Sequence, residues 1–228
     1  MLVPSYVFFA LASTGSSLVN SVFTVYGVKR FKPLIKRGVL LSMLLIVPPW
    51  TFILLELGKP FQMYNLYVFF QFDSRMSWMG GLYMIFFFSL LVELVIVIKE
   101  ESLPTWVPKA IGIFVLLATL AVHTNLGALF GAIHAKSLWS THLLPVHFIV
   151  SAVMSGAAFH ILFTSVTYIV KRGSVPDQLR SLFSRSLVPL IVVLQVVNFI
   201  LLAEKIVVGM AGGHSGVEIL VAGRYSVL

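Results

Sequence analysis

The 228-residue sequence contains no cysteine and little charge. Without thiols, this chain can form no disulfide, no thiolate-held iron–sulfur cluster and no covalent c-type haem of its own. Charged residues make up 11% of the chain and hydrophobic residues 59%, whereas about 25% of a soluble domain is charged. A chain with so little polar surface cannot cover a soluble fold. The two shortages therefore indicate an all-α integral membrane protein.

The amino terminus also lacks the marks of a cleaved signal peptide. The opening MLVPSYVFFALASTGSS has no basic region and no small-residue cleavage site. We find no soluble domain, low-complexity tract or internal repeat, so we expect one transmembrane domain over residues 1–228. Hydropathy predicts six spans of about 20 or more residues. They cover residues 4–28, 38–57, 77–98, 109–131, 144–170 and 187–210.

Positive charge is distributed unevenly between the two sets of connections. The connections after the first, third and fifth spans hold eleven Lys and Arg, against four on the other side: Lys59, Arg75, Lys136 and Arg224. The positive-inside rule therefore predicts a multi-pass protein of the cell membrane with both termini extracytoplasmic. The net charge of +8 lies mainly in short loops beside the headgroups. Such loops suit a lipid surface and exclude a nucleic-acid-binding face.

The connection between the second and third spans, residues 58–76, is unusually aromatic. Two interpretations stay open for it: an interfacial belt of amphipathic rings, or a cap or lateral entrance for a flat, lipid-soluble ligand. Its aromatic residues, with one that follows, are Phe61, Tyr64, Tyr67, Phe69, Phe70, Phe72 and Trp78.

Polar residues inside the spans are costly in lipid and need a reason. Glu56 closes the second span at its outer end, and the run from His123 to Asn125 lies toward the outer end of the fourth. Asn20, Glu93 and His160 each lie 16 residues in from an outer end, or roughly 24 Å. We therefore predict an outer polar pocket, in which Glu56 is a proton-transfer group, followed by an inward polar trail for protons.

Simpler roles remain open for two members of the trail, since Glu93 could reach the inner interface and His160 could be a hydrogen-bonded packing residue.

Two further patterns concern helix packing. Small residues four apart, Ser13 with Ser17 and Ala152 with Gly156, predict close helix contacts. The pair Pro48-Pro49 predicts an interruption of the second span that frees backbone carbonyls, for which a packing kink is the simpler role.

Several motifs occur in an order that resembles a known family. They are SYVFFALASTGSSLV (5–19), LLELGKP (54–60), SRMSWMGG (74–81) and HTNLGALFGAIHAKSLWSTHLLPVHFIVSAVMSGAA (123–158). Together they resemble the NrfD-type family, the membrane-anchor subunits of polysulfide-reductase-like complexes. The chain looks closest to the branch of that family found in redox complexes of sulfur and sulfate metabolism, which carries an H-x-N-L-G motif in its fourth helix.

The resemblance implies a haem-free subunit of a respiratory oxidoreductase complex that exchanges electrons and protons with menaquinone or ubiquinone. It implies a four-helix quinone bundle over residues 1–131 and the start of a second bundle over 144–228. It also implies that a ferredoxin-like iron–sulfur subunit docks on the extracytoplasmic side, with a multihaem cytochrome c and further membrane subunits as other partners. By the resemblance, the quinone pocket is lined by His123, Thr124, Asn125, Glu56, Ser77 and Trp78, and the chain binds no metal.

Family members usually have eight or more spans, so we expect a fragment or a subunit that a second polypeptide completes.

Three other functions stay open. A purely structural anchor would use the same fold. A b-type cytochrome needs histidines at matched depth, yet His123 and His147 differ by roughly 10 Å. A secondary transporter needs helices broken at mid-membrane, for which only Pro48-Pro49 qualifies.

Overall fold

The computed structural model describes residues 2–27, 31–56, 58–59, 64–99, 103–104, 106–131, 143–171 and 173–211. Within these ranges, six helices are long and apolar enough to cross a membrane. The predicted all-α, multi-pass architecture is therefore confirmed. The spans are formed by α1 (Leu2–Tyr26), α2 (Lys32–Glu56), α4 (Arg75–Ile98), α5 (Trp106–Gly131), α6 (Leu144–Val170) and α8 (Val188–Ala211). The sixth span, Asp177–Val207, also includes the helical residues that directly precede α8. The shorter elements are α3 (Asn65–Val68), α7 (Asp177–Leu182) and the π-helical turn η4 (Phe183–Leu187).

Two features of α2 differ from the predictions. Helix α2 begins at Lys32, six residues before the predicted span, because the basic residues of its first turns lie within the helix. Long basic side chains allow this, since their charged ends can reach the headgroups from a helix end. Helix α2 also continues through Pro48 and Pro49. Pro48 and Pro49 therefore do not break the helix, and the prediction of a break at this place is wrong.

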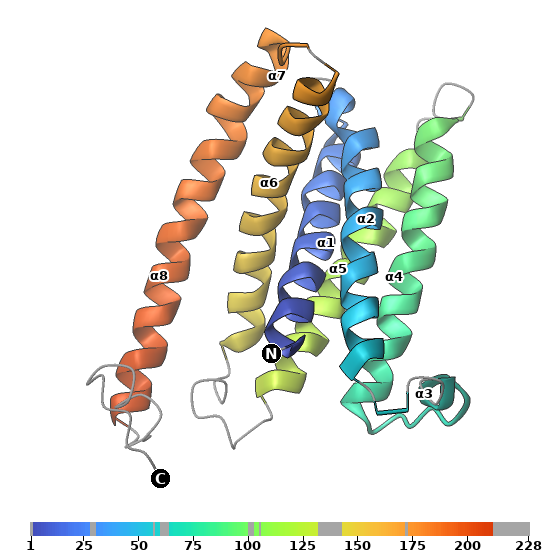
Figure 1. Cartoon of the computed structure of the whole chain (residues 1–228), viewed down its shortest axis with the longest axis vertical. Coiled ribbons are helices and arrows are strands. Elements are labelled where there is room, and N and C mark those ends of the chain that lie inside the picture. Colours follow the sequence, from blue (N-terminus) through green and yellow to red (C-terminus); the bar gives the residue numbers. More distant parts are fainter. Residues whose placement is uncertain are drawn as a thin grey trace.

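Four of the long helices form a bundle (Figure 1). Helix α1 packs against α2 and α5, and α4 packs against the same two helices, so α1 and α4 face each other across the bundle. Helix α6 packs against α1 and α5, and α8 packs mainly against α6 at the edge of the molecule. The centre of the bundle is therefore reached by side chains from α1, α2, α4 and α5.

Helices α1 and α6 cross at very short range through small residues. A side chain on Gly15 would overlap the backbone of Ala152, and one on Gly156 would overlap the backbone of Gly15. The predicted close contact through Ala152 and Gly156 is confirmed, with Gly15 as its partner. Two residues before Gly15, Ser13 Oγ donates to the Ser42 carbonyl of α2 at 2.7 Å, which also fixes α1 against α2.

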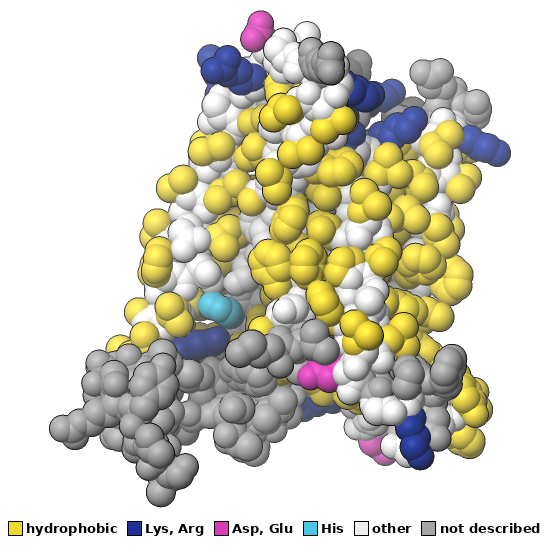
Figure 2. Space-filling view, in the orientation of Figure 1, with side chains coloured by type: hydrophobic (Ala, Val, Ile, Leu, Met, Phe, Trp, Pro, Cys, Tyr) yellow, Lys and Arg dark blue, Asp and Glu magenta, His cyan; other side chains and the backbone are white. Residues whose placement is uncertain are grey.

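Charged side chains gather at the two ends of the bundle, and apolar side chains form the band between them (Figure 2). One end carries most of the described Lys and Arg: Lys32, Lys36, Arg37, Lys99, Lys109, Lys171, Arg180 and Arg185. The opposite end has Lys59, Arg75 and Lys205 among the described residues. Lys136 and Arg224 lie outside the described residues. We call the first end the basic end.

Candidate functional site

The predicted polar trail meets in space on the basic-end side of the bundle. Asn20 Nδ2 of α1 donates to Glu93 Oε1 of α4 at 3.3 Å, a contact that crosses the bundle between its two opposed helices. His160 Nε2 of α6 lies 3.2 Å from Ser16 Oγ and 3.1 Å from the Ser16 carbonyl. All four side chains are buried. We call Ser16, Asn20, Glu93 and His160 the inner polar cluster.

The two halves of this cluster meet beside Gly38 of α2, which leaves space for them because it has no side chain. A Cβ on Gly38 would lie 2.5 Å from Asn20 Oδ1 and closer still to Cε1 of His160. Both side chains therefore occupy the space that any larger residue would need. A helix with a side chain at this position would separate His160 from Asn20.

Several oxygens of the inner region have no hydrogen-bond partner within the described part of the chain. They are Asn20 Oδ1, Glu93 Oε2, Ser17 Oγ, Ser21 Oγ and Thr164 Oγ1. An unpaired buried polar group is costly in lipid, because no solvent is there to satisfy it. Such groups are free to bind water, and the Glu93 carboxyl can also hold a proton.

Two more buried polar side chains lie farther toward the opposite end of the bundle. His123 of α5 is fully buried, and neither of its ring nitrogens has a partner among the described residues. The hydroxyl of Tyr83 on α4 is also buried without a partner there. Counted from the helix ends away from the basic end, both residues lie about 12 Å deep. We call His123 and Tyr83 the outer polar pair.

Buried hydroxyls occupy the depth between the two polar groups. Ser42, Ser89 and Thr119 lie roughly 18–21 Å deep on α2, α4 and α5, whereas Asn20 and Glu93 lie about 24–27 Å deep. Each hydroxyl donates to a carbonyl of its own helix: Gly38 for Ser42, Phe86 for Ser89 and Val115 for Thr119. This leaves the lone pairs of their oxygens available as acceptors. Polar atoms are thus spaced through the bundle from the outer polar pair to the inner polar cluster.

Sequence reasoning missed Tyr83 and the three hydroxyls. Tyr83 lies in an apolar stretch of the third span, where a tyrosine is usually an interfacial residue. Ser and Thr are common in membrane helices because they bond to their own backbone, so their presence carries little signal. Only the packing of the helices shows which of them face the bundle centre.

The polar groups of three predicted pocket residues are used to fix the α3–α4 connection. Trp78 Nε1 donates to the Phe72 carbonyl at 2.8 Å. The Ser77 backbone N–H donates to Ser74 Oγ at 3.4 Å, and Ser77 Oγ accepts from the Gln71 N–H at 3.5 Å. Asn125 Nδ2 of α5 donates to the Arg75 carbonyl at 3.1 Å, which clamps α5 to the first turn of α4.

The other two predicted pocket residues are exposed. Glu56 ends α2 and Thr124 faces outward on α5. Among the described residues, no hydrogen bond joins either of them to His123. Glu56 also lies roughly 12 Å nearer the helix ends than His123. Of the six predicted pocket residues, His123 is therefore the one with buried polar atoms left free.

A comparison with known families accounts for the order of the motifs. The family model described as NrfD, polysulphide reductase, matches residues 1–222. The chain belongs to the NrfD family. A selenate reductase subunit of Mesobacillus selenatarsenatis is 26% identical, over 70% of this chain and 46% of that protein. The Hdr-like menaquinol oxidoreductase integral membrane subunit of Archaeoglobus fulgidus is 26% identical, over 77% of this chain and 44% of that protein.

This NrfD-family chain spans about half the length of the curated relatives it matches. No solved structure matches it. The resemblance to the NrfD family drawn from the motifs is confirmed, and the branch in sulfur and sulfate metabolism stays a prediction.

The aromatic connection of this NrfD-family chain packs around Trp78. The rings of Phe70 and Phe72 lie edge-on to Trp78, with centroids 5.4 and 6.4 Å away, and to each other at 5.2 Å. Burial raises the pKa of the Tyr67 hydroxyl in α3 above its ordinary value. Phe61 lies outside the described residues. The packing is compatible with both interpretations of this connection.

A separate polar seam joins α6 to α8. Ser151 Oγ donates to Asn198 Oδ1 at 3.2 Å. The seam also has unpaired atoms within the described residues, at Nδ1 of the half-buried His147 and at Glu204 Oε2. Sequence reasoning passed over Glu204 and Lys205, which lie inside the sixth span. This seam lies outside the four-helix bundle that holds the inner and outer polar groups.

Proposed function

We propose that this chain is a quinone-interacting membrane subunit of a respiratory redox complex. It would exchange electrons and protons between menaquinone or ubiquinone and an iron–sulfur partner subunit on the extracytoplasmic side. The NrfD-family match over nearly the whole chain supports this proposal, as does a relative whose name contains menaquinol oxidoreductase. The observation that carries it is the buried His123 ring, neither of whose nitrogens has a partner within the described part of the chain.

The residues present fit a quinone. A quinone has carbonyl oxygens on a flat apolar ring, so its site needs buried donors within an aromatic and aliphatic wall. His123 N–H and the Tyr83 hydroxyl are such donors, and Phe86, Val115 and Val122 belong to the apolar cluster against which Tyr83 packs. A bound quinone would supply two-electron, two-proton redox chemistry. The chain would contribute donors, an apolar wall and acid–base groups.

Electrons must come from outside this chain. It has no cysteine with which to hold an iron–sulfur cluster, so we assign that role to a partner subunit, with a multihaem cytochrome c and further membrane subunits as additional partners. We orient the basic end toward the cytoplasm, by the positive-inside rule. The outer polar pair then lies on the extracytoplasmic half of the bundle, beneath the α3–α4 connection.

Protons would reach the outer polar pair from the cytoplasmic side. The inner polar cluster supplies a carboxyl at Glu93 and an imidazole at His160, which can each hold and release a proton. Between the two groups, Ser42, Ser89 and Thr119 offer acceptor oxygens to bridging water. Moving one charge across 100 mV is worth about 2.3 kcal/mol, so this route would contribute to the membrane potential.

The quinone part is tested with His123→Leu in the complex as it co-purifies with its partner subunits. Loss of a buried donor is worth about 1–3 kcal/mol, which lowers quinone-dependent turnover by up to about a hundredfold. His147→Leu is the matched control, because His147 lies in the α6–α8 seam. Normal turnover in the assembled His123→Leu complex would leave a structural anchor as the function of this chain.

The proton part is tested with Glu93→Gln in reconstituted vesicles. The amide keeps an oxygen that can accept from Asn20 but cannot release a proton at the same place. We expect less charge translocated per quinone converted. Glu204→Gln, which removes a carboxyl of the α6–α8 seam, should leave that ratio unchanged. Equal ratios in Glu93→Gln and wild type would make Glu93 a packing residue.

A further inference from the structure

Three buried hydroxyl groups differ from the others in the membrane-spanning helices. Within the described residues, every buried serine and threonine takes part in a side-chain hydrogen bond except Ser17, Ser21 and Thr164. A hydroxyl in a membrane helix usually donates to a carbonyl of its own helix, as Thr24 does to Asn20 at 3.1 Å. Ser17 and Ser21 lie on the same helix and lack this bond, so their oxygens are available to another ligand.

Ser17 and Ser21 face the centre of the four-helix bundle. The side chain of Asn20 lies against α2, and that of Val25 lies against α5, so these two residues mark two directions around α1. At about 100° per residue, Ser17 and Ser21 point between those directions. Helix α4 lies across the bundle on that side, because it packs against both α2 and α5.

The carboxyl of Glu93 reaches the same place from α4. Its Oε1 accepts from Asn20 Nδ2 at 3.3 Å, and its Oε2 has no partner within the described part of the chain. Ser21 directly follows Asn20, and Ser17 lies one turn earlier on the same face. Side chains one turn apart on a helix have Cβ atoms about 5–6 Å apart. The free carboxyl oxygen is therefore within side-chain reach of both hydroxyls.

The atoms left free at this place are oxygens. They are Glu93 Oε2, Ser17 Oγ and Ser21 Oγ, and all three side chains are at most 1% exposed. Oxygen ligands are the ones that hard cations prefer. One carboxylate balances one positive charge, whereas a divalent ion would leave a buried net charge, which is costly. The set of ligands therefore suits a monovalent metal ion.

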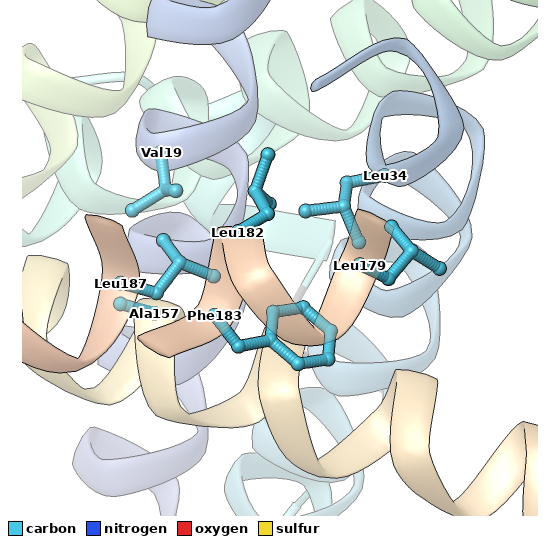
Figure 3. Close-up of a cluster of buried hydrophobic side chains, with 7 residues drawn as sticks. All are labelled: Val19, Leu34, Ala157, Leu179, Leu182, Phe183 and Leu187. Atoms are coloured by element: carbon cyan, nitrogen blue, oxygen red, sulfur yellow. The ribbon is translucent and has the colours of Figure 1, made fainter. Parts of the chain in front are cut away.

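The opposite side of α1 is packed with apolar side chains. Val19, which points away from Ser17 and Ser21, belongs to a buried cluster with Leu34 of α2, Ala157 of α6 and side chains of α7 and η4 (Figure 3). Close packing of this kind leaves no room for water. The two hydroxyls are therefore separated from lipid and solvent on that side of α1.

We propose that Glu93 Oε2 and the hydroxyl oxygens of Ser17 and Ser21 bind a sodium ion at the centre of the bundle. Asn20 Nδ2 would hold the carboxylate in place, and water would complete the coordination shell. The family resemblance implied no metal, and a sodium ion departs from that expectation. Binding itself does not depend on the proposed quinone function. In the complex, sodium and protons would compete for the carboxyl that the proposed proton route uses.

The test measures binding of radioactive Na⁺ to the purified complex in a buffer whose other salt is choline chloride. We expect a saturable component, one ion per copy of this chain, which Glu93→Gln abolishes because it removes the charge. Ser17→Ala and Ser21→Ala should each weaken the affinity roughly tenfold, which corresponds to about 1.4 kcal/mol. Thr14→Val is the matched control, because the Thr14 hydroxyl is buried on the same helix and already donates to the Ala10 carbonyl at 2.7 Å.

The serine variants also separate a lost ligand from a damaged fold. Alanine removes a buried hydroxyl that has no partner within the described residues, so the Tm measured without sodium should not fall. A weaker affinity at an unchanged Tm supports the site. The proposal is overturned if wild type shows no saturable binding, if Glu93→Gln binds as wild type does, or if both serine variants do.

Failure of the sodium site and failure of the proton route give different results. If wild type binds no sodium but Glu93→Gln lowers the charge translocated per quinone converted, the sodium site is overturned and the proton route stands. If sodium binds as expected but that ratio is the same in Glu93→Gln and wild type, the sodium site is supported and the proton route is wrong.

Discussion

Replacement of Gly38 by alanine perturbs the inner polar cluster without removing any of its functional groups. The added Cβ would lie 2.5 Å from Asn20 Oδ1, whereas ordinary contact begins at 3.4 Å. Asn20 must therefore retreat by about 0.9 Å, and the His160 ring must move farther still. The Asn20–Glu93 hydrogen bond is already 3.3 Å long, which is beyond the usual range of 2.7–3.2 Å. We expect it to break.

The effect on stability should be modest and the effect on proton transfer large. Leaving one buried polar group unpaired is worth about 1–3 kcal/mol, and Gly to Ala in a helix returns about 0.5–1 kcal/mol. The net loss is about 0–2.5 kcal/mol, which lowers the Tm by up to about 10 °C for a domain of this size. The complex should therefore assemble, while charge translocated per quinone converted falls as it does in Glu93→Gln.

Gly81→Ala is the matched control for this experiment. Gly81 also lies in a membrane-spanning helix, but its Cβ would lie 3.5 Å from Phe70 Cε2, which is an ordinary contact. Its charge translocation and Tm should equal or slightly exceed those of wild type. If Gly38→Ala shows the full translocation ratio together with a lowered Tm, the cluster is structural. The reasoning that links its geometry to proton transfer is then refuted.

Two further predictions concern the membrane orientation and the packing of α6. A reporter fused after Leu228 should be active outside the cytoplasm, and a tag within residues 173–176 should be reached only from the cytoplasm. Labelling of that tag on intact cells would reverse the orientation. Gly156→Leu should separate α6 from α1, because the backbone of Gly15 fills the space of any side chain there, at a loss of at least about 1–3 kcal/mol. A thermal unfolding measurement checks this, with Ala158→Leu, at an exposed position of α6, as the control expected to keep its Tm.

The sequence alone predicted the helices and the family because these depend on local patterns. Runs of about 20 apolar residues define spans without any knowledge of neighbours, and the motifs lie along the chain in a fixed order. The equal depth of Asn20, Glu93 and His160 followed from counting residues along each predicted span. Depth along the bundle is only one of the coordinates that place a side chain, however. The rotation of each helix about its own axis decides which neighbours that side chain faces.

The rotation of each helix could not be read from these spans, because each is apolar around most of its circumference. A soluble helix reveals its buried face by amphipathic periodicity, but lipid and protein interior are equally apolar. For this reason the sequence grouped Thr124 and Asn125 with His123. Adjacent positions point about 100° apart on a helix, so His123 faces the bundle, Thr124 faces outward and Asn125 reaches the first turn of α4.

The rotation of each helix also determines which buried polar groups find a hydrogen-bond partner and which do not. The side chains of Asn125, Ser77 and Trp78 are hydrogen-bonded to neighbouring backbone, so each is satisfied where it lies. His123, Tyr83 and Glu93 retain free polar atoms in the centre of the bundle, within the part of the chain that the structure describes. Packing alone would favour apolar residues at those positions, since each unpaired group destabilises the fold. Free polar atoms at two depths, with hydroxyls between them, are what a chain needs in order to bind a polar ring at one level and to supply protons to it from another.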